Sequence, residues 1–216
     1  MEKNAYVQSG TNIRKIAVIG FNRRLAATLI DGLILLVGTF MLSMAIGLAG
    51  VFLDFYREDN PIPVHTLVTI CGLILSLLYY VVAWTKSGQT IAKSVLGIKV
   101  VGSTGKPLSI GKALLRYLGY IISAAALSLG FVWIVFDKKR QGWHDKIASS
   151  YVVDGQVDLY AGKSFEFVPA DQKLSWGWLA IWLLIALVMP SALLSSLYIL
   201  GPTIGLTVTQ LFLGLR

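Results

Sequence analysis

The stretch RLAATLIDGLILLVGTFMLSMAIGLAGVFL occupies residues 24–53 and decides the fold class, because it is apolar apart from one carboxylate near its start. A helix over residues 25–53 would be about 43 Å long, at about 1.5 Å per residue. This length exceeds the roughly 30 Å hydrocarbon core of a bilayer, so the helix is expected to tilt or to protrude. The sequence therefore predicts a transmembrane helix that begins at Arg24 and carries Asp31 into the membrane.

The composition agrees with an integral membrane protein. Of the 216 residues, 56% are hydrophobic and only 14% are charged, whereas soluble domains have about 25% charged residues. The net charge of +8 does not indicate nucleic acid as a partner, because the bases flank apolar runs as the positive-inside bias places them. The single cysteine, Cys71, excludes a disulfide framework and a cysteine-based metal site. Residues 1–24 lack the short apolar core of a cleavable signal peptide, so the first helix is expected to act as its own insertion signal.

The charges on the connecting segments predict the topology. A second run of spanning length covers residues 64–85, after a segment, residues 54–63, with three acids and one base. Residues 86–116 contain five lysines, one arginine and no acid, and residues 1–24 contain five bases and one acid. Basic segments stay in the cytoplasm, so we expect residues 1–24 and 86–116 inside and residues 54–63 outside.

Residues 117–136 allow two interpretations. Their length suffices for one crossing, but Gly130 divides the run, and the basic cluster of residues 137–140 follows at once. A single crossing would put that cluster outside, whereas a re-entrant segment or helical hairpin keeps it in the cytoplasm. We favour the hairpin.

Two loosely similar stretches support the hairpin, although chance similarity is the alternative. Residues 88–101 and 142–153 each run from a glycine through a short amphipathic stretch to a Val-Val pair. The strand-like ends, residues 97–101 and 150–153, are predicted to pair, with residues 103–106 as a turn. They can pair only if both lie on the same side of the membrane.

Beyond this region we expect a polar cytoplasmic excursion over residues 154–175 and an additional C-terminal membrane segment over residues 176–216. The run 176–200 has tryptophans at its entry and contains Pro190, where a helix is expected to kink. The run 203–215 is short for a crossing. The predicted fold class is thus an all-α polytopic membrane protein, a small helix bundle with a re-entrant or hairpin segment and a small cytoplasmic β element.

Arg24 and Asp31 form the candidate functional site of the first helix. They lie seven residues apart, on one helix face, with a rise of about 10 Å between them. Direct contact needs a spacing of three or four residues, so each is expected to find a partner elsewhere, and Asp145 is the candidate for Arg24. A charged carboxylate in the membrane costs about 2.5–3.5 kcal/mol on insertion scales. It therefore carries a proton or pins helix packing through hydrogen bonds, and both interpretations stay open.

Four motifs in order resemble the RDD family of membrane proteins. They are Gly20-Phe21-Asn22-Arg23-Arg24-Leu25-Ala26-Ala27-Thr28-Leu29-Ile30-Asp31, Gly88-Gln89-Thr90-Ile91-Ala92-Lys93 with Leu96-Gly97-Ile98-Lys99-Val100-Val101, Leu115-Arg116-Tyr117, and Gln141-Gly142-Trp143-His144-Asp145-Lys146. The resemblance covers about residues 18–155 and implies that Arg24 and Asp31 are the family's named arginine and first aspartate. It implies Asp145 as the second aspartate, with Asp137 as the alternative. Asn22 and Ala92 depart from the family's usual aromatic and glycine.

Four further residues are secondary candidates: Asp137, His144, Lys93 and Arg116. His144 beside Asp145 suits a proton relay, but one histidine and one aspartate make no metal site. Lys93, Lys99, Lys106 and Lys112 suit anionic lipid headgroups, or they set the topology. With no nucleophile–base pair and no phosphate or dinucleotide motif, the sequence indicates a non-enzyme without metal or cofactor.

Two functions follow as hypotheses. The first is transport coupled to protons or monovalent cations at Asp31, which the resemblance also implies, because some family members are described as cation/proton antiporters. The second is a membrane scaffold or assembly factor, since a eukaryotic relative acts as an adaptor in a membrane protein complex. Few crossings imply a homo- or hetero-oligomer. The expected location is the bacterial inner (plasma) membrane, with the N-terminus in the cytoplasm.

Overall fold

The computed structural model describes residues 6–7, 13–52, 64–126, 128–157, 165–170, 176–177 and 180–181. The chain divides into two compact units. One unit comprises residues 1–31 and 79–186, and the other comprises residues 32–78 and 187–216. Each unit is described by itself below.

Two long helices, α1 (Phe21–Phe52) and α2 (Val64–Lys86), are each apolar and long enough to cross a membrane. They match the two predicted spans closely. The predicted start of the first helix at Arg24 is wrong by one turn, because α1 begins at Phe21. Phe21 and Leu25 are buried in one apolar cluster, so this first turn is held by packing inside its unit.

Small residues bring α1 and α2 close together in the second unit. A Cβ atom on Gly38 would lie 3.6 Å from the Leu75 side chain. A Cβ atom on Gly72 would lie only 3.2 Å from Thr39, tighter than an ordinary van der Waals contact. Gly38 belongs to the stripe of small residues below Asp31 that suits close helix approach, and the structure places it against the neighbouring helix.

The other unit contains a five-stranded sheet made of β1 (Tyr6–Val7), β2 (Arg14–Val18), β3 (Ile98–Gly102), β4 (Ser150–Asp154) and β5 (Phe165–Pro169). The strand order is β1-β2-β4-β3, and β5 pairs with β2 in parallel. The predicted pairing of β3 with β4 is confirmed: they run antiparallel, from Ile98 opposite Asp154 to Gly102 opposite Ser150. One crossing between them would separate them across the membrane, so this pairing favours the hairpin.

The sheet is larger than the predicted β element, and "all-α" is therefore too simple. The N-terminal segment supplies β2, which buries Ile16 and Val18 completely, and the polar excursion supplies β5. Ile16 and Val18 alternate with residues that are only partly buried, as expected for a strand with one face on a core. Ile16 packs with Val101 and Val153, which come from distant segments.

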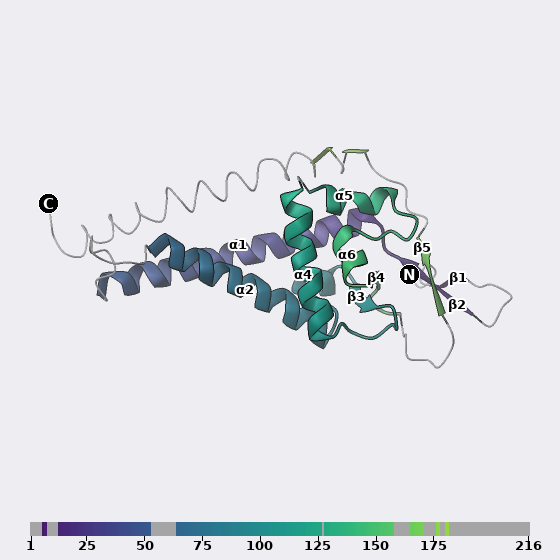
Figure 1. The fold of residues 1–216 in the computed structure, drawn as a ribbon, viewed down its shortest axis with the longest axis horizontal. Helices are drawn as coiled ribbons and strands as arrows, with labels where there is room; N and C mark the ends of the chain where they lie inside the picture. The colour runs from purple at the N-terminus through teal and green to yellow at the C-terminus, as the bar shows by residue number, and fades with distance from the viewer. Residues whose placement is uncertain are drawn as a thin grey trace. The chain divides into compact units, whose positions relative to one another are not determined.

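Four shorter helices complete this unit: α3 (Ile91–Val95), α4 (Ile110–Ala125), α5 (Leu129–Phe136) and α6 (Trp143–Ile147). Figure 1 shows α5 turning away from the end of α4, and the two axes differ by 99°. The break comes just before Gly130 rather than at it. A Cβ atom on Gly130 would lie 2.2 Å from Ser123 Oγ, so the glycine instead lets α5 approach α4.

Helix α4 has an inverted distribution of polarity. Its buried face carries Arg116, Gly119 and Ser123, while Leu118 and Ile121 are each more than half exposed. A soluble helix buries its apolar face and exposes its polar one. The inversion is typical of a helix that faces lipid outward and shields polar groups inward. The pair α4–α5 would thus add a third membrane segment, either as a broken span or as a re-entrant loop.

The predictions for the C-terminal region lie largely outside the described residues. Only residues 176–177 and 180–181 are described there, and both pairs are helical. The proposed kink at Pro190, the run 203–215 and the acidic segment 54–63 also lie outside.

Candidate functional site

Asp31 is completely buried and accepts hydrogen bonds from two segments, the end of α2 and the start of α3. The hydroxyls of Tyr79 and Thr90 each donate to its carboxylate at 2.6 Å. The backbone N–H of Ala92 donates at 3.2 Å, and the Lys93 ammonium lies 3.5 Å away. One carboxylate in α1 therefore holds the end of α2 and the start of α3, with a buried lysine as its ionic partner.

The local sequence explains how the hydrogen-bond donors are positioned around Asp31. Thr90 is the N-cap residue of α3, where its oxygen accepts from the Lys93 backbone N–H while its hydroxyl proton goes to Asp31. Threonine suits this position because its side chain satisfies an otherwise free helix N–H. Gly88 precedes it with φ +73°, and a Cβ atom there would meet the Val100 carbonyl at 2.3 Å. Only glycine fits this sharp turn between α2 and α3.

Asp145 forms a second buried carboxylate cluster. Arg24 donates to Asp145 Oδ2 at 2.6 Å, and Arg116 donates to Oδ1. The Gly142 backbone N–H adds a third hydrogen bond at 3.0 Å, and Arg116 also donates to Ser150 in β4. The expected partnership between Arg24 and Asp145 is thus present. It ties α1 to α6, and Arg116 ties α4 to the same carboxylate.

Arg24 also connects the sheet to the membrane helix. Its Nε donates to the Ile19 carbonyl at 2.9 Å, and the Ile19 N–H donates to Val152 in β4. The guanidinium therefore spans the short link between β2 and α1. A lysine has no planar fork with which to hold both partners.

Electrostatics keep Asp145 ionised and His144 neutral. Burial alone would raise the pKa of Asp145, but the guanidiniums of Arg116 and Arg24 outweigh burial, so this pKa lies well below its usual range. Burial first, and then the charges of Arg116 and Arg24, lower the pKa of His144 from 6.5 to about 3 against the pull of Asp145. His144 Nε2 lies 3.5 Å from Asp145 Oδ2, so at neutral pH this contact is no ion pair.

Comparison with known proteins identifies the family. The sequence model of the RDD family matches residues 18–149. The chain belongs to the RDD family. The match ends close to the boundary that the four motifs predict, and it contains both carboxylate clusters.

Individual relatives of this RDD protein are similar over different shares of their length. The uncharacterized protein YxaI of Bacillus subtilis (strain 168) is 32% identical over 147 residues, which are 62% of this chain and 95% of YxaI. The proline-rich antigen homolog of Mycobacterium tuberculosis (strain H37Rv) is 35% identical over 91 residues, 42% of this chain and 38% of that protein. The uncharacterized protein RP437 of Rickettsia prowazekii is 27% identical over 91 residues, which are 41% of this chain and 50% of RP437. No solved structure matches.

The structure of this RDD protein separates the two residues that the sequence placed on one helix face. Arg24 bonds to Asp145, while Asp31 bonds to Lys93. Both secondary candidates with positive charge, Lys93 and Arg116, therefore belong to the two clusters. Another secondary candidate, Asp137, lies outside both clusters and pairs with Lys146 at 2.5 Å.

The contacts of Asp137 give it a structural role in a turn. Burial opposes its ionisation, but hydrogen bonds from Lys146 and from the backbone N–H groups of Gln141 and Lys139 lower its pKa overall. This carboxylate closes the turn after α5. No group of three or more potential metal ligands occurs among the described residues.

Sequence reasoning missed the hydroxyl donors Tyr79 and Thr90. In the sequence, Tyr79 fits an interfacial aromatic belt at the end of the second apolar run, and Thr90 stands out only as part of a family motif. A signal existed for Thr90, because a threonine directly after a Ser-Gly-Gln turn is a typical helix N-cap. The contact of Tyr79 with Asp31 depends on the packing of α2 on α1, which no local pattern reveals.

The four lysines considered for lipid headgroups differ in accessibility. Lys93 is buried against Asp31, and Lys99 Nζ donates to the Val157 carbonyl at 2.7 Å. Lys106 is exposed, and Lys112 is half-buried. Lys106 is therefore the most exposed of the four.

Proposed function

We propose that this RDD protein exchanges a monovalent cation for a proton at the Asp31–Lys93 pair. The observation that carries the proposal is a buried carboxylate in a membrane helix whose single ionic partner among the described residues is an ammonium 3.5 Å away. Ionisable groups inside a membrane segment are functional candidates by default. Lysine suits the role because an ammonium can release a proton, whereas the arginine guanidinium stays protonated.

The chemistry balances in charge and in atoms. A monovalent cation binds the Asp31 carboxylate in place of the Lys93 ammonium, and Lys93 then releases one proton as a neutral amine. Binding the proton again restores the ion pair and expels the cation. The site keeps the same net charge in both states, which matters because an uncompensated charge in a buried site is costly. The Thr90 oxygen lies beside the carboxylate, and oxygen ligands suit hard cations.

Access requires movement and assembly. Asp31 is fully buried, so the cycle includes a step that opens the packing of α2 and α3 against it. Two or three crossings per chain are few for a pathway, so the proposal includes a homo- or hetero-oligomer. It also keeps the protein a non-enzyme in the bacterial inner membrane, with its N-terminus in the cytoplasm.

Purified protein in liposomes tests the exchange. Acid-loaded vesicles with an internal pH dye receive an external pulse of Na⁺ or K⁺, and proton efflux is recorded. We expect efflux with the wild type, and none with Asp31→Asn. Lys93→Arg is the sharpest variant, because it retains the positive charge beside Asp31 but releases no proton; it should also be inactive. Asp137→Asn, outside the cluster, should behave as the wild type.

Equal efflux in wild type, Asp31→Asn and protein-free vesicles would exclude exchange. Loss of activity in Asp137→Asn as well would point to general misfolding and not to the Asp31 site. Folding of each variant is checked by size-exclusion chromatography in the same detergent.

A second candidate, a membrane scaffold or assembly factor, is favoured by a different observation. Asp31 accepts four hydrogen bonds, and it is not among the residues that line the cavity beside Arg24 and Lys93. A carboxylate satisfied in this way suits a lock between helices. Crosslinking and affinity capture from native membranes test this candidate, and recovery of the protein alone would count against it.

A further inference from the structure

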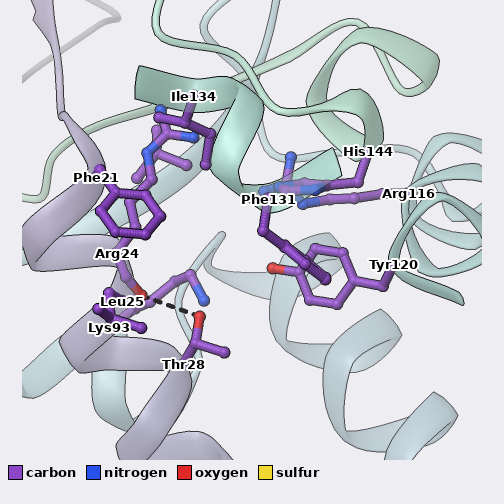
Figure 2. Close-up of a pocket in the computed structure, with 11 residues that line it drawn as sticks. Phe21, Arg24, Leu25, Thr28, Lys93, Arg116, Tyr120, Phe131, Ile134 and His144 are labelled. Atoms are coloured by element: carbon purple, nitrogen blue, oxygen red, sulfur yellow. Dashed lines mark hydrogen bonds between the residues drawn. The ribbon is translucent and has the colours of Figure 1, made fainter. Parts of the chain in front are cut away.

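A small cavity lies between the two carboxylate clusters. Its volume is about 30 Å³, and a water molecule needs at least about 10–15 Å³ on this measure. Figure 2 shows Arg24, Lys93 and Thr28 on one wall and Arg116, Tyr120 and His144 on the other. The remaining wall is apolar. A space of this size holds about two water molecules or one small ion.

Two donors of this cavity's arginines have no acceptor. Arg24 Nη2 and Arg116 Nε are buried and make no hydrogen bond within the described chain. Both side chains are more than nine-tenths buried. An unpaired buried N–H costs about 1–3 kcal/mol, and more when it belongs to a charged group. The two guanidiniums already share the carboxylate of Asp145, so another acceptor is needed for these remaining N–H groups.

The formal charges identify the acceptor. Arg24, Lys93 and Arg116 are positive, while Asp31 and Asp145 are negative, so the buried cluster has one positive charge in excess. His144 adds none at neutral pH, because its pKa is lowered to about 3. Water would satisfy the N–H groups but would leave the excess charge uncompensated. A monovalent anion meets both requirements, and burying a charge without a partner is expensive.

We propose that the cavity between Arg24, Arg116 and Lys93 binds a small inorganic anion of the halide class, for which chloride is the physiological candidate. Two hydroxyl-bearing side chains, Tyr120 and Thr28, also line the cavity. Tetrahedral oxyanions such as sulfate exceed a space for about two waters. The site is distinct from the exchange pair in its ligand, because it binds an anion at the guanidiniums and not a cation at Asp31.

Anomalous diffraction from crystals grown in bromide tests the site directly. We expect a bromide peak in the cavity, within hydrogen-bond distance of Arg24 Nη2 and Arg116 Nε. Weak density without an anomalous signal at saturating bromide would mean that water fills the cavity, and would overturn the proposal. This measurement uses the wild-type chain and does not depend on any transport activity.

A matched pair of variants supplies the second test. Thr28→Asp places a negative charge in the cavity lining and should remove halide binding. Thr28→Asn introduces a side chain with nearly the same shape as aspartate but without the charge, so halide binding should be retained. Thermal unfolding is measured in chloride and in gluconate at equal ionic strength. We expect chloride to raise the Tm of the wild type and of Thr28→Asn, but not of Thr28→Asp. An equal chloride effect on all three would show a general salt effect and would contradict the site.

The two proposals fail separately. Exchange at Asp31 is tested by efflux, which does not require bromide in the cavity. If bromide binds while efflux is absent, the anion site stands and the exchange proposal falls, and the opposite result reverses this conclusion.

Discussion

The two buried carboxylates of this RDD protein, Asp145 and Asp31, are held by different kinds of partner. Asp145 lies between two guanidiniums, one on each oxygen, and accepts a backbone N–H in addition. Asp31 has a single ammonium at 3.5 Å, and its shortest hydrogen bonds come from neutral hydroxyls at 2.6 Å. Hydrogen bonds to either carboxylate are charge-assisted, but only Asp145 has a cationic donor on each of its oxygens. We therefore predict that Asp145 holds the fold, and that Asp31 is the carboxylate that changes partners.

The largest expected effect is at Asp145. Asp145→Asn leaves Arg24 and Arg116 buried without their counter-charge, and breaking a buried ion pair from one side costs about 3–5 kcal/mol. We expect loss of most folded protein in detergent, measured by thermal unfolding. Asp137→Asn removes a single ion pair of the same unit, in which Lys146 is 45% exposed and Asp137 is 11% exposed, and should cost only about 1 kcal/mol. Equal losses of stability in the two variants would contradict the prediction that Asp145 holds the fold.

Asp31→Asn should destabilise the protein less. The amide oxygen still accepts from one hydroxyl, but Lys93 loses its ionic partner, and hydrogen bonds to charged groups contribute about 1.5–3 kcal/mol. The measurement is chemical unfolding in the same detergent as for Asp145→Asn. A loss as large as that of Asp145→Asn would assign Asp31 to the fold and favour the scaffold candidate.

How far the sequence predicts these clusters depends on the range of the contacts. The two spans, the β3–β4 pair and the partnership of Arg24 with Asp145 follow from hydropathy, alternation and the need to compensate a buried charge. Strands β2 and β5 were missed because short strands beside charged residues carry little local signal, although Ile16 and Val18 alternate as a half-buried strand does. Tyr79 was missed because its role depends on helix packing.

His144 predicts a dependence of stability on pH that belongs to the Asp145 cluster alone. Its pKa falls from 6.5 to about 3 on folding, so between these values the unfolded chain binds the proton and the folded chain does not. Stability is therefore complete above pH 6.5 and declines as pH falls toward 3, by up to about 1.4 kcal/mol per pH unit. Unfolding midpoints between pH 7 and 4.5 measure this slope.

His144→Gln is the matched variant for this slope. It keeps a polar side chain but cannot titrate, so its midpoints should vary less between pH 6.5 and 4.5 than those of the wild type. An unchanged slope in His144→Gln would assign the pH dependence to other groups. Below about pH 3.8, protonation of Asp145 in the unfolded chain adds a further loss in both proteins, because its folded pKa is depressed.

The smallest expected effect is at Tyr79, and it tests whether neutral hydroxyls hold Asp31. Tyr79→Phe removes one donor to the carboxylate and the acceptor of the Ile91 N–H, which should cost about 1–2 kcal/mol. Tyr151→Phe is the control, because this ring stacks on Phe167 in the sheet and keeps that packing without its hydroxyl. If exchange depends on a loosely held Asp31, Tyr79→Phe should lower stability yet leave cation-driven efflux measurable, or even faster. Loss of efflux at unchanged stability would instead make the Tyr79 hydroxyl a ligand of the cation, since the hydroxyl would then be needed in the bound state and not for the fold.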